Sequence, residues 1–355
     1  MRILMACDVS TDGEGNPYAL QLLHAIERDS RIEAVQHGTS WLQVTDVDFD
    51  VMHVQWPEAL FGFQEPTESE LSQLACHLDR LQVEEGTPLV VTVHNEYPHG
   101  QDTARFKRLY QLVYERADAF IHLGDRSREV IRRRYAEEIG SACETVIPHG
   151  NYSYYPDEIS REEARDLLSV PPDAPVWLVF GAVRKDQEVE LLRKAFLQAR
   201  QGSEQLIVAS QLPHRPLRDW QHVPTRLSLW LNSQVHLHES HVPAKQVQTY
   251  LNAADVLVLP RIDALNSGTV ALGCTFGTVV VGPSQGVIGE MLDNQGCPVF
   301  KSPSPEALAK AMQKGLHQAQ EGKGEKLRRC ATRRLNWDRI ADSHIGVYTS
   351  IKEEQ

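Results

Sequence analysis

The sequence lacks a surplus of positive charge and any long apolar run, and each absence excludes a class of protein. A net charge of −12 argues against a general nucleic-acid binder, because neutralising phosphates needs an excess of Lys and Arg. No apolar run approaches the length of a membrane span, and the first one, from Met1 to Cys7, meets Asp8 far short of a signal sequence. We therefore expect a cytoplasmic protein that contacts a membrane, if at all, only peripherally at its inner face.

The sequence also lacks paired cysteine motifs. Its six cysteines are widely scattered and contain no C-x-x-C pair: Cys7, Cys76, Cys143, Cys274, Cys297 and Cys330. This spacing predicts neither a zinc site nor a disulfide framework, and it fits a reducing compartment. We expect no metal site.

Length and composition indicate a chain that folds throughout. At 355 residues it is too long for one ordinary core, which predicts about two domains. Hydrophobic residues make up 41% and charged residues 24%, as in ordinary globular proteins, so nothing in the composition predicts long disorder.

Short apolar runs alternate with segments of helical spacing. In the first half the runs predict strands at residues 2–7, 32–37, 51–54, 89–94, 119–123 and 145–147. In the second half they predict strands at 176–180, 205–209, 235–238, 256–259 and 279–281, with helices near 188–200, 245–253 and 304–320. This alternation is typical of parallel sheets covered by helices on both faces. We predict an α/β protein with two doubly wound, Rossmann-like halves facing a cleft.

Local signals place the helix starts and the crossing between halves. Asn16 before Pro17 predicts a helix start, and Thr67 with Glu70 predicts a capping box. Residues 151–160 lose all periodicity, so we expect a first domain at 1–155 and a second at 161–335. A last helix at 336–355 would complete the first domain.

The candidate site residues of the first half follow its predicted strands. They are Gly13 and Gly15 after the first strand, Trp56 and Glu58 after the third, and His94, Asn95 and Glu96 after the fourth. Open α/β sheets bind ligands beyond the carboxyl ends of their strands, where glycine amides can hold an anion and His or Glu can transfer protons. Other interpretations stay open: the glycines form a plain turn, His94 is structural, and Trp56 belongs to the core.

The second half carries two features that suit phosphate. Arg184 and Lys185 follow its first strand, and they could hold a diphosphate. A helix is expected to open in the loop that contains Asn266, Ser267, Gly268 and Thr269. Its amides and hydroxyls would meet phosphate oxygens there, with the helix dipole adding attraction.

The order of these segments resembles the two-domain glycosyltransferases of the GT-B fold, most closely the retaining family 4. The resemblance covers DVMHVQWPEAL, LVVTVHN, TVIPHGNY, VFGAVR, AADVLVLP, TFGTVVVGPSQGVIGE and the terminal NWDRIADSHIGVYTSI. It implies that Arg184 contacts the donor diphosphate, that the Asn266–Thr269 loop binds phosphate through its amides, and that His94 lies near the transferred sugar. It also implies transfer without a metal ion, because cations and helix amides stabilise the leaving group instead.

The sequence departs from this family at three positions. Gln187 stands where the family has a lysine, although Lys185 could reach the same anion. The family's two glutamates fall on Ala264 and Leu272, so neither carboxylate is present. The substitutes would be Asp263, if the loop shifts, and Glu290. Retention of configuration is implied only by the resemblance, since the sequence identifies no nucleophile.

The resemblance therefore implies transfer of a hexose-type sugar from a nucleotide-sugar, with UDP or GDP as carrier, to a glycan, lipid-linked or small-molecule acceptor. The alternatives are a catalytically silent scaffold or binding protein, and a nucleotide-sugar epimerase on the same fold. A phosphorylase would need a pyridoxal-binding lysine, and a glycoside hydrolase would need a positioned carboxylate pair, and the sequence suggests neither. Two basic runs, at 126–134 and 326–334, are interpreted as solvated helix faces, with docking on anionic lipid as the alternative.

Overall fold

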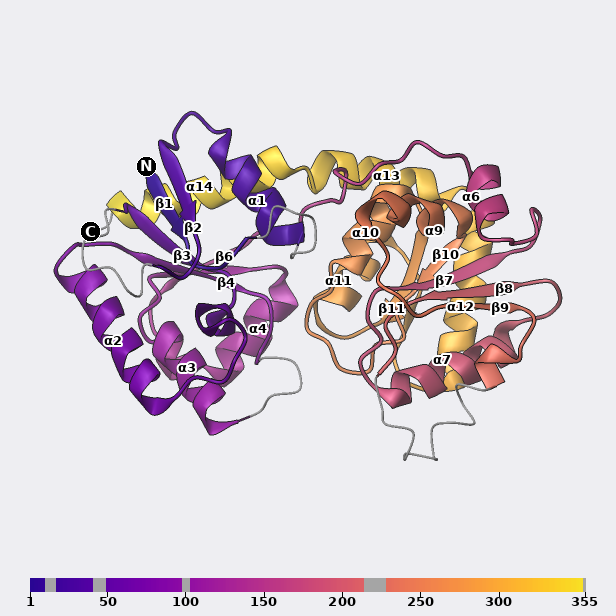
Figure 1. Cartoon of the computed structure of the whole chain (residues 1–355), viewed down its shortest axis with the longest axis horizontal. Helices are drawn as coiled ribbons and strands as arrows, with labels where there is room; N and C mark the ends of the chain where they lie inside the picture. The colour runs from indigo at the N-terminus through magenta and orange to yellow at the C-terminus, as the bar shows by residue number, and fades with distance from the viewer. Residues whose placement is uncertain (10–16, 41–48, 98–102, 214–227, 354–355) are drawn as a thin grey trace. The chain divides into compact units, whose positions relative to one another are not determined.

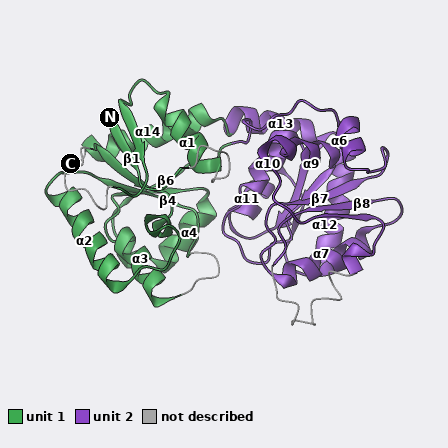
Figure 2. Ribbon diagram, viewed as in Figure 1, with its two compact units in different colours: residues 1–150, 335–355 green, residues 151–334 purple. Residues whose placement is uncertain are grey.

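The computed structural model describes residues 1–9, 17–40, 49–97, 103–213 and 228–353. The chain divides into two compact units, one formed by Met1–Gly150 with Leu335–Gln355 and the other by Asn151–Arg334 (Figure 2). Within the described residues, each unit holds one six-stranded parallel sheet with helices on its faces (Figure 1). The predicted α/β class with two Rossmann-like halves is confirmed.

The sheet of the first unit has the strand order β2-β1-β3-β4-β5-β6. Its strands are β1 (Arg2–Met5), β2 (Ala34–His37), β3 (Val51–Val54), β4 (Leu89–Val93), β5 (Ala119–His122) and β6 (Cys143–Val146). Every residue of β3, β4 and β5 is buried. Helices cover both faces of a parallel sheet, which explains why these strands are mostly apolar on both faces, with one buried polar residue in each: His53, Thr92 and His122.

The helices of the first unit are α1 (Pro17–Glu27), η2 (Pro57–Phe61), α2 (Glu68–Val83), α3 (Ala104–Tyr114), α4 (Asp125–Arg134), α5 (Ala136–Ile139) and α14 (Trp337–Glu353). The predicted capping box is present, because Thr67 accepts a hydrogen bond from the backbone N–H of Glu70 while Glu70 accepts from that of Thr67. The terminal α14 packs against α1 and buries one face of its own in this unit.

The second unit repeats the pattern with the order β12-β11-β10-β7-β8-β9. Its strands are β7 (Val176–Phe180), β8 (Gln205–Ala209), β9 (Val235–His238), β10 (Val256–Val258), β11 (Val279–Pro283) and β12 (Val299–Phe300). Its helices are α6 (Arg161–Leu167), α7 (Asp186–Ala199), η3 (Ala244–Gln246), α9 (Val247–Ala253), α10 (Thr269–Phe276), α11 (Gly286–Gln295), α12 (Pro305–Gln320) and α13 (Lys323–Arg334). The sequence prediction missed β12, which is too short to show a period, and it did not delimit α13.

Candidate functional site

The strand order locates a ligand crevice in the second unit. The chain passes from β7 to β8 on one side of β7 and later places β10 on its other side. The loops that leave the carboxyl ends of β7 and β10 therefore diverge, and such a switch point is where open α/β sheets bind ligands. The β7 loop carries Arg184 and Lys185, and the β10 loop carries Asn266, Ser267 and Gly268.

The β10 loop ends at the start of α10, as the sequence predicted. Gly268 is the N-cap residue of α10, so the N-cap position has no side chain to cap the helix, and the first turn contains no acidic residue. The Ser267 hydroxyl lies 3.1 Å from that of Thr269 and accepts from its backbone N–H. The first backbone amides of a helix have no partner within the helix, and together with two hydroxyls they are suited to binding an anion. The helix dipole alone stabilises such an anion by about 0.3–1 kcal/mol.

The β7 loop contributes the cations. Arg184 is exposed, and the pKa of its guanidinium is lowered by partial loss of solvent and by the charge of Arg261. Lys185 pairs with Asp263 at 3.3 Å, and both side chains are largely exposed. Arginine remains a cation at neutral pH, so the crevice keeps positive charge.

Sequence reasoning missed a buried ion pair beneath these two loops. Glu188 on α7 is 1% exposed and lies 3.2 Å from Nη1 of Arg261, which is 13% exposed. The Glu188 carboxylate also accepts from the backbone N–H of Arg184 at 3.0 Å and of Ile262 at 3.3 Å. Arg261 in turn donates to the carbonyl oxygen of Ala182. The only sequence signal was a Glu at a position whose neighbours Val189 and Leu192 lie in the core.

A glycine holds the β10 loop from the other side. Gly286, at the start of α11, has φ +59°, and a Cβ there would lie 2.6 Å from the carbonyl oxygen of Leu265. The next residue, Val287, donates its backbone N–H to the same carbonyl at 2.8 Å. Close approach of α11 therefore fixes the loop that carries Asn266, and only glycine fits at this position.

The positions of the missing carboxylates are now visible. Leu272 is buried inside α10, while Ala264 lies half-buried in the β10 loop. Asp263 is 82% exposed and engaged with Lys185. Glu290 lies half-buried on α11. Its proposed role as a substitute remains a prediction.

In the first unit the switch point falls between β1 and β3. Gly13, Gly15 and the Asn16 cap lie outside the described residues. The other candidates follow β3 and β4. His94 is 8% exposed and stacks on Trp56, with ring centroids 4.0 Å apart and an interplanar angle of 20°. The Trp56 side chain is thus buried and packs against the face of the His94 ring.

A chain of buried hydrogen bonds continues behind His94. Its Nε2 lies 3.0 Å from Oε1 of Gln55, and the Gln55 amide nitrogen lies 3.2 Å from Nε2 of His53. His53 reaches the Tyr348 hydroxyl at 2.7 Å through Nδ1 and Thr92 at 2.8 Å through Nε2. Because an amide oxygen can only accept, His94 carries its proton on Nε2.

Burial keeps these histidines neutral. It lowers the pKa of His94 and His53 well below the ordinary value, and nearby histidines add to the effect. It also lowers the pKa of His149 to about 4. A neutral imidazole of fixed tautomer can form a hydrogen bond with a hydroxyl without the free-energy cost of burying a charged ring.

The remaining candidates of the first unit have partners within it. Glu58 is buried, accepts from the Tyr110 hydroxyl at 2.7 Å, and has a pKa raised by burial. Glu96 pairs with Arg134 on α4 at 3.2 Å. Asn95, between Glu96 and His94, is half-buried. Glu96 thus meets a cation, whereas Glu58 lies in an apolar environment.

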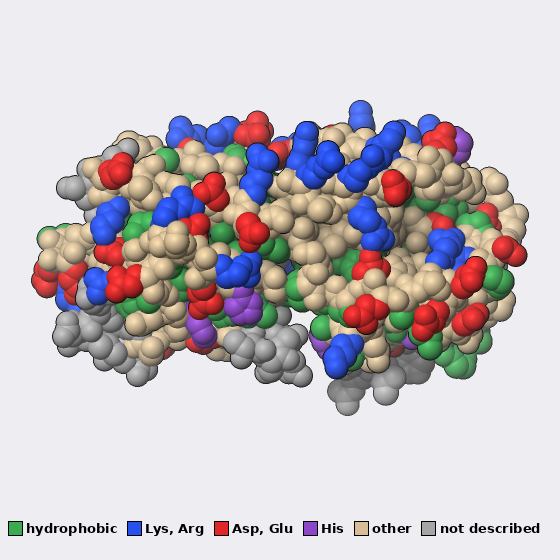
Figure 3. Space-filling model, turned by 90° about the horizontal axis from the view of Figure 1, so that it is seen from above, with side chains coloured by type: hydrophobic (Ala, Val, Ile, Leu, Met, Phe, Trp, Pro, Cys, Tyr) green, Lys and Arg blue, Asp and Glu red, His purple; other side chains and the backbone are tan. Residues whose placement is uncertain are grey.

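The two basic runs lie on α4 and α13. On α4, Arg128 pairs with Asp125 and Arg132 with Glu144. On α13, buried Leu327 and Ala331 face the core while the cations point outward. Figure 3 shows Lys and Arg side chains gathered in a row over this helix. The described residues of both helices fit a solvated outer face.

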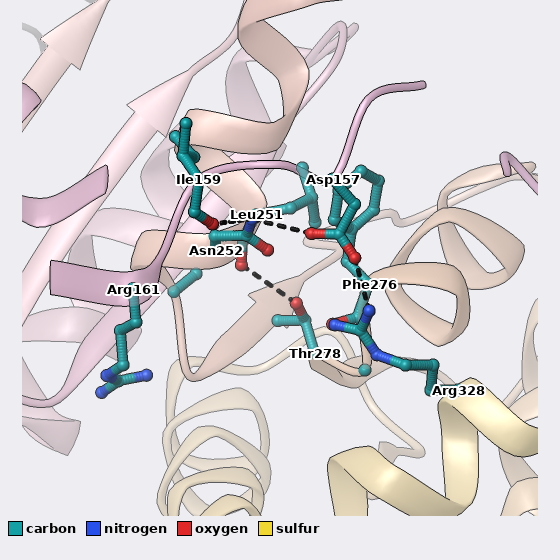
Figure 4. A pocket seen from close by; sticks show the side chains of 10 residues that line it. Asp157, Ile159, Arg161, Leu251, Asn252, Phe276, Thr278 and Arg328 are labelled. Carbon is teal, nitrogen blue, oxygen red and sulfur yellow. Dashed lines mark hydrogen bonds and ion pairs between the residues drawn. The ribbon is translucent and has the colours of Figure 1, made fainter. Parts of the chain in front are cut away.

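A separate pocket of about 340 Å³ lies at the other end of the strands of the second sheet, near the amino ends of β10 and β11. Its cations already have partners: Arg328 pairs with Asp157 and donates to the carbonyl oxygen of Phe276 at 2.7 Å (Figure 4). Arg161 pairs with Asp255 at 2.7 Å. These contacts fasten residues 157–161 to the sheet, so the pocket is no part of the crevice at Arg184.

Two features are absent from the described residues. None of their helices is both long and apolar enough to cross a membrane. Among the same residues, no group of three or more His, Cys, Asp and Glu side chains is arranged to hold a metal ion.

Comparison with known proteins agrees with this geometry. Residues 174–318 match the family model described as glycosyl transferases group 1. No curated protein matches the sequence at a significant level. The residues that match the family model include both the β7 loop and the β10 loop of the crevice in the second unit.

Solved structures are similar over the whole chain. Sucrose-phosphate synthase from Thermosynechococcus elongatus is 16% identical, with a TM-score of 0.71 and all of both chains covered. HepE from Anabaena, in complex with UDP and glucose, is 14% identical, with a TM-score of 0.70 over 99% of this chain and 100% of that one. A glycosyltransferase from Rickettsia africae is 12% identical, with a TM-score of 0.71 over 100% and 99%. Residues 174–318 thus form a group 1 glycosyltransferase domain, and the chain is a glycosyltransferase with the GT-B fold of two Rossmann-like domains.

Proposed function

We propose that this glycosyltransferase takes a hexose-type sugar from a nucleotide-sugar whose diphosphate binds in the crevice between the β7 and β10 loops. The observation that carries the proposal is that the loop of Arg184 and the loop that leads into α10 follow the neighbouring strands β7 and β10 at the switch point of the second sheet. HepE, which shares the fold, is described in complexes with UDP and with UDP-glucose. The carrier is proposed to be UDP or GDP.

The charges of the crevice suit a leaving diphosphate. In transfer, the bond from the sugar C1 to the diphosphate oxygen breaks and the nucleoside diphosphate leaves with the electron pair. The acceptor hydroxyl forms the new bond to C1 and loses its proton. Arg184 and the amides of α10 would stabilise the charge that develops on the diphosphate, so we propose that the reaction needs no metal ion.

The acceptor side is proposed to lie in the first unit. His94 is neutral, held in one tautomer and stacked on Trp56, which suits it to hydrogen-bond a sugar hydroxyl. A glycan, a lipid-linked sugar or a small molecule would serve as acceptor. Exposed Phe63, at 55%, adds apolar surface after η2.

The test begins with thermal shifts for UDP, GDP and ADP and for their sugar conjugates, because a ligand that binds the folded state raises its stability. The conjugate that stabilises most is then incubated with candidate acceptors, with and without EDTA. Transfer should release nucleoside diphosphate only when acceptor is present. Release without a glycosylated product would point to an epimerase, and binding without turnover to a silent scaffold.

A further inference from the structure

The donor crevice depends on a buried ion pair that ties its two loops together. Glu188 is almost fully buried at the start of α7, and Arg261 comes directly after β10. We propose that Glu188 and Arg261 are positioning residues for the diphosphate: they act through the loops that bind it and do not touch it themselves. This inference rests on the proposed function.

The contacts of the pair cross the switch point. Glu188 accepts from the backbone N–H of Arg184 in the β7 loop and from that of Ile262 in the β10 loop, at 3.0 and 3.3 Å. Arg261, which follows β10, donates to the carbonyl oxygen of Ala182 in the β7 loop. Each charged group therefore holds backbone of the opposite loop, and the separation of the two loops is set by one salt bridge.

This arrangement fixes the backbone from which Arg184 projects. The bond from the Arg184 N–H to Glu188 is a charge-assisted one, which is stronger than a neutral hydrogen bond. At the rim the loops are joined again, by Lys185 and Asp263, but that pair is exposed and contributes little. The buried pair is thus the contact that determines where the Arg184 guanidinium stands relative to the start of α10.

A positioning role and a purely electrostatic role of Glu188 predict opposite changes in diphosphate affinity when its charge is removed. If the carboxylate influenced the site only through its charge, removing it would strengthen binding of a diphosphate, because a repelling anion is gone. If it positions the loops, removing it weakens binding of the diphosphate. Glu188→Gln also replaces one carboxylate oxygen by an amide N–H₂ group, which cannot accept hydrogen bonds from the backbone N–H groups that now donate to Glu188.

The experiment compares affinities of the full chain for UDP, GDP and ADP with those for the matching nucleosides. We expect Glu188→Gln to weaken diphosphate binding roughly tenfold to a hundredfold, as the loss of a hydrogen bond between Arg184 and a charged phosphate would, and to leave nucleoside binding nearly unchanged. The matched control is Glu190→Gln on the same helix, which weakens half-buried pairs with Arg193 and Lys194 that lie within α7, and it should bind diphosphate as the parent protein does.

A second variant separates positioning from folding. Glu188→Gln destabilises the protein by leaving Arg261 without its counter-charge, whereas Glu188→Gln combined with Arg261→Met removes both charges and should recover much of the lost Tm. The double variant should still bind the diphosphate weakly. Recovery of both Tm and diphosphate affinity would show that the pair is only structural and would overturn the proposal.

Arg184→Ala serves as the reference. If it lowers the preference for diphosphate over nucleoside while Glu188→Gln leaves that preference unchanged or raises it, the positioning role is wrong and the donor site stands. If neither variant changes the preference, the donor site itself is misplaced.

Discussion

The side-chain oxygen of Gln55 accepts a hydrogen bond from Nε2–H of His94 at 3.0 Å, in the buried interior of the first unit. The amide nitrogen of Gln55 points to His53, which is itself held by Tyr348 on α14 and by Thr92. A strand-end histidine is thus oriented by a side chain of the neighbouring strand end and, one step further, by the C-terminal helix.

This relationship predicts that Gln55→Leu lowers turnover about tenfold, less than the roughly 10²–10⁴-fold contributed by a group that itself transfers a proton, and leaves affinity for nucleoside diphosphate unchanged. The variant deprives Nε2–H of its acceptor, and the ring loses its fixed orientation. Steady-state kinetics with calorimetric binding checks both quantities, and His94→Ala should reproduce the split. Gln111→Leu, which breaks a bond to Glu138, is the control.

Gln55→Glu gives a sharper readout. A carboxylate at this position would stabilise the protonated ring and raise the pKa of His94 from its depressed value. If neutral His94 is the active form, the acid limb of the pH–rate profile should move to higher pH. A profile identical to that of the parent protein would remove His94 from the mechanism.

Arg184→Ala should weaken binding of nucleoside diphosphate far more than binding of the nucleoside, because the lost contact is to phosphate. Hydrogen bonds to charged groups contribute about 1.5–3 kcal/mol, which corresponds to roughly a tenfold to hundredfold loss of affinity. Calorimetry with UDP and uridine, or with the guanosine pair, measures the difference. An equal loss for both ligands would reject the assignment.

Gly286→Ala should displace the β10 loop. The new Cβ would lie 2.6 Å from the carbonyl oxygen of Leu265 and 2.9 Å from that of Ala264, in a backbone conformation with positive φ. We expect lower stability and weaker diphosphate binding. Gly322→Ala is the matched control, since Gly322 also has a positive φ but a Cβ there would have no atom of the described residues within 4 Å. Diphosphate affinity that falls equally in both variants would argue against a specific role of the loop contact.

The sequence predicted the strands best where both ends are marked by a change of pattern. Residues 51–54, 176–180 and 205–209 were placed without error, because buried parallel strands are short, mainly apolar runs between polar loops. The half-buried edge strand at 235–238 was also placed without error. The first strand was drawn through Cys7, yet β1 ends at Met5, where the Cys7 N–H turns back to the Met5 carbonyl. Apolar residues continue past that turn, so composition could not mark it.

The site was predictable where chemistry stands at strand ends and unpredictable where it depends on tertiary pairing. Arg184 and Ser267 are polar residues after apolar runs, and the loops that carry them do flank one crevice. Glu188 looked like an ordinary helix residue, because nothing local announces that Arg261, 73 residues later, lies 3.2 Å away. The hydrogen bond between Gln55 and His94 could not be predicted for the same reason, since the two residues follow different strands.

The stability of the first unit should fall as the pH falls below about 6.5. Burial lowers the pKa of His122, His149 and His344 to about 4, and those of His53 and His94 also lie well below the ordinary 6.5. Between pH 6.5 and 4 the unfolded chain therefore binds more protons than the folded one. Each histidine costs up to about 1.4 kcal/mol per pH unit in that window, and none contributes a pH dependence above it.

Hydrogen exchange checks this prediction within one sample. Between pH 7 and pH 5, after correction for intrinsic rates, protection should fall more in β3, β4 and α14 than in β7 and β8 of the second unit. Equal loss in both sheets would contradict the histidine explanation.

Gly150→Ala should loosen the attachment of α14 to the first unit. A Cβ at Gly150 would lie 2.3 Å from the Trp337 ring, which also meets Tyr18 with ring centroids 5.4 Å apart, so the indole has to move. Overpacking of this kind costs about 1–3 kcal/mol in the free energy of unfolding, measured by urea titration.

The control for this variant lies on α14, the helix that carries Trp337. A Cβ at Gly346, in the middle of α14, would have no atom of the neighbouring described elements within 4 Å, so Gly346→Ala should be neutral or stabilise by up to about 1 kcal/mol. Opposite signs for the two variants would locate the cost in the Trp337 contact. A loss at Gly346 as large as that at Gly150 would instead show that α14 tolerates no added methyl group, and the specific contact would lose its support.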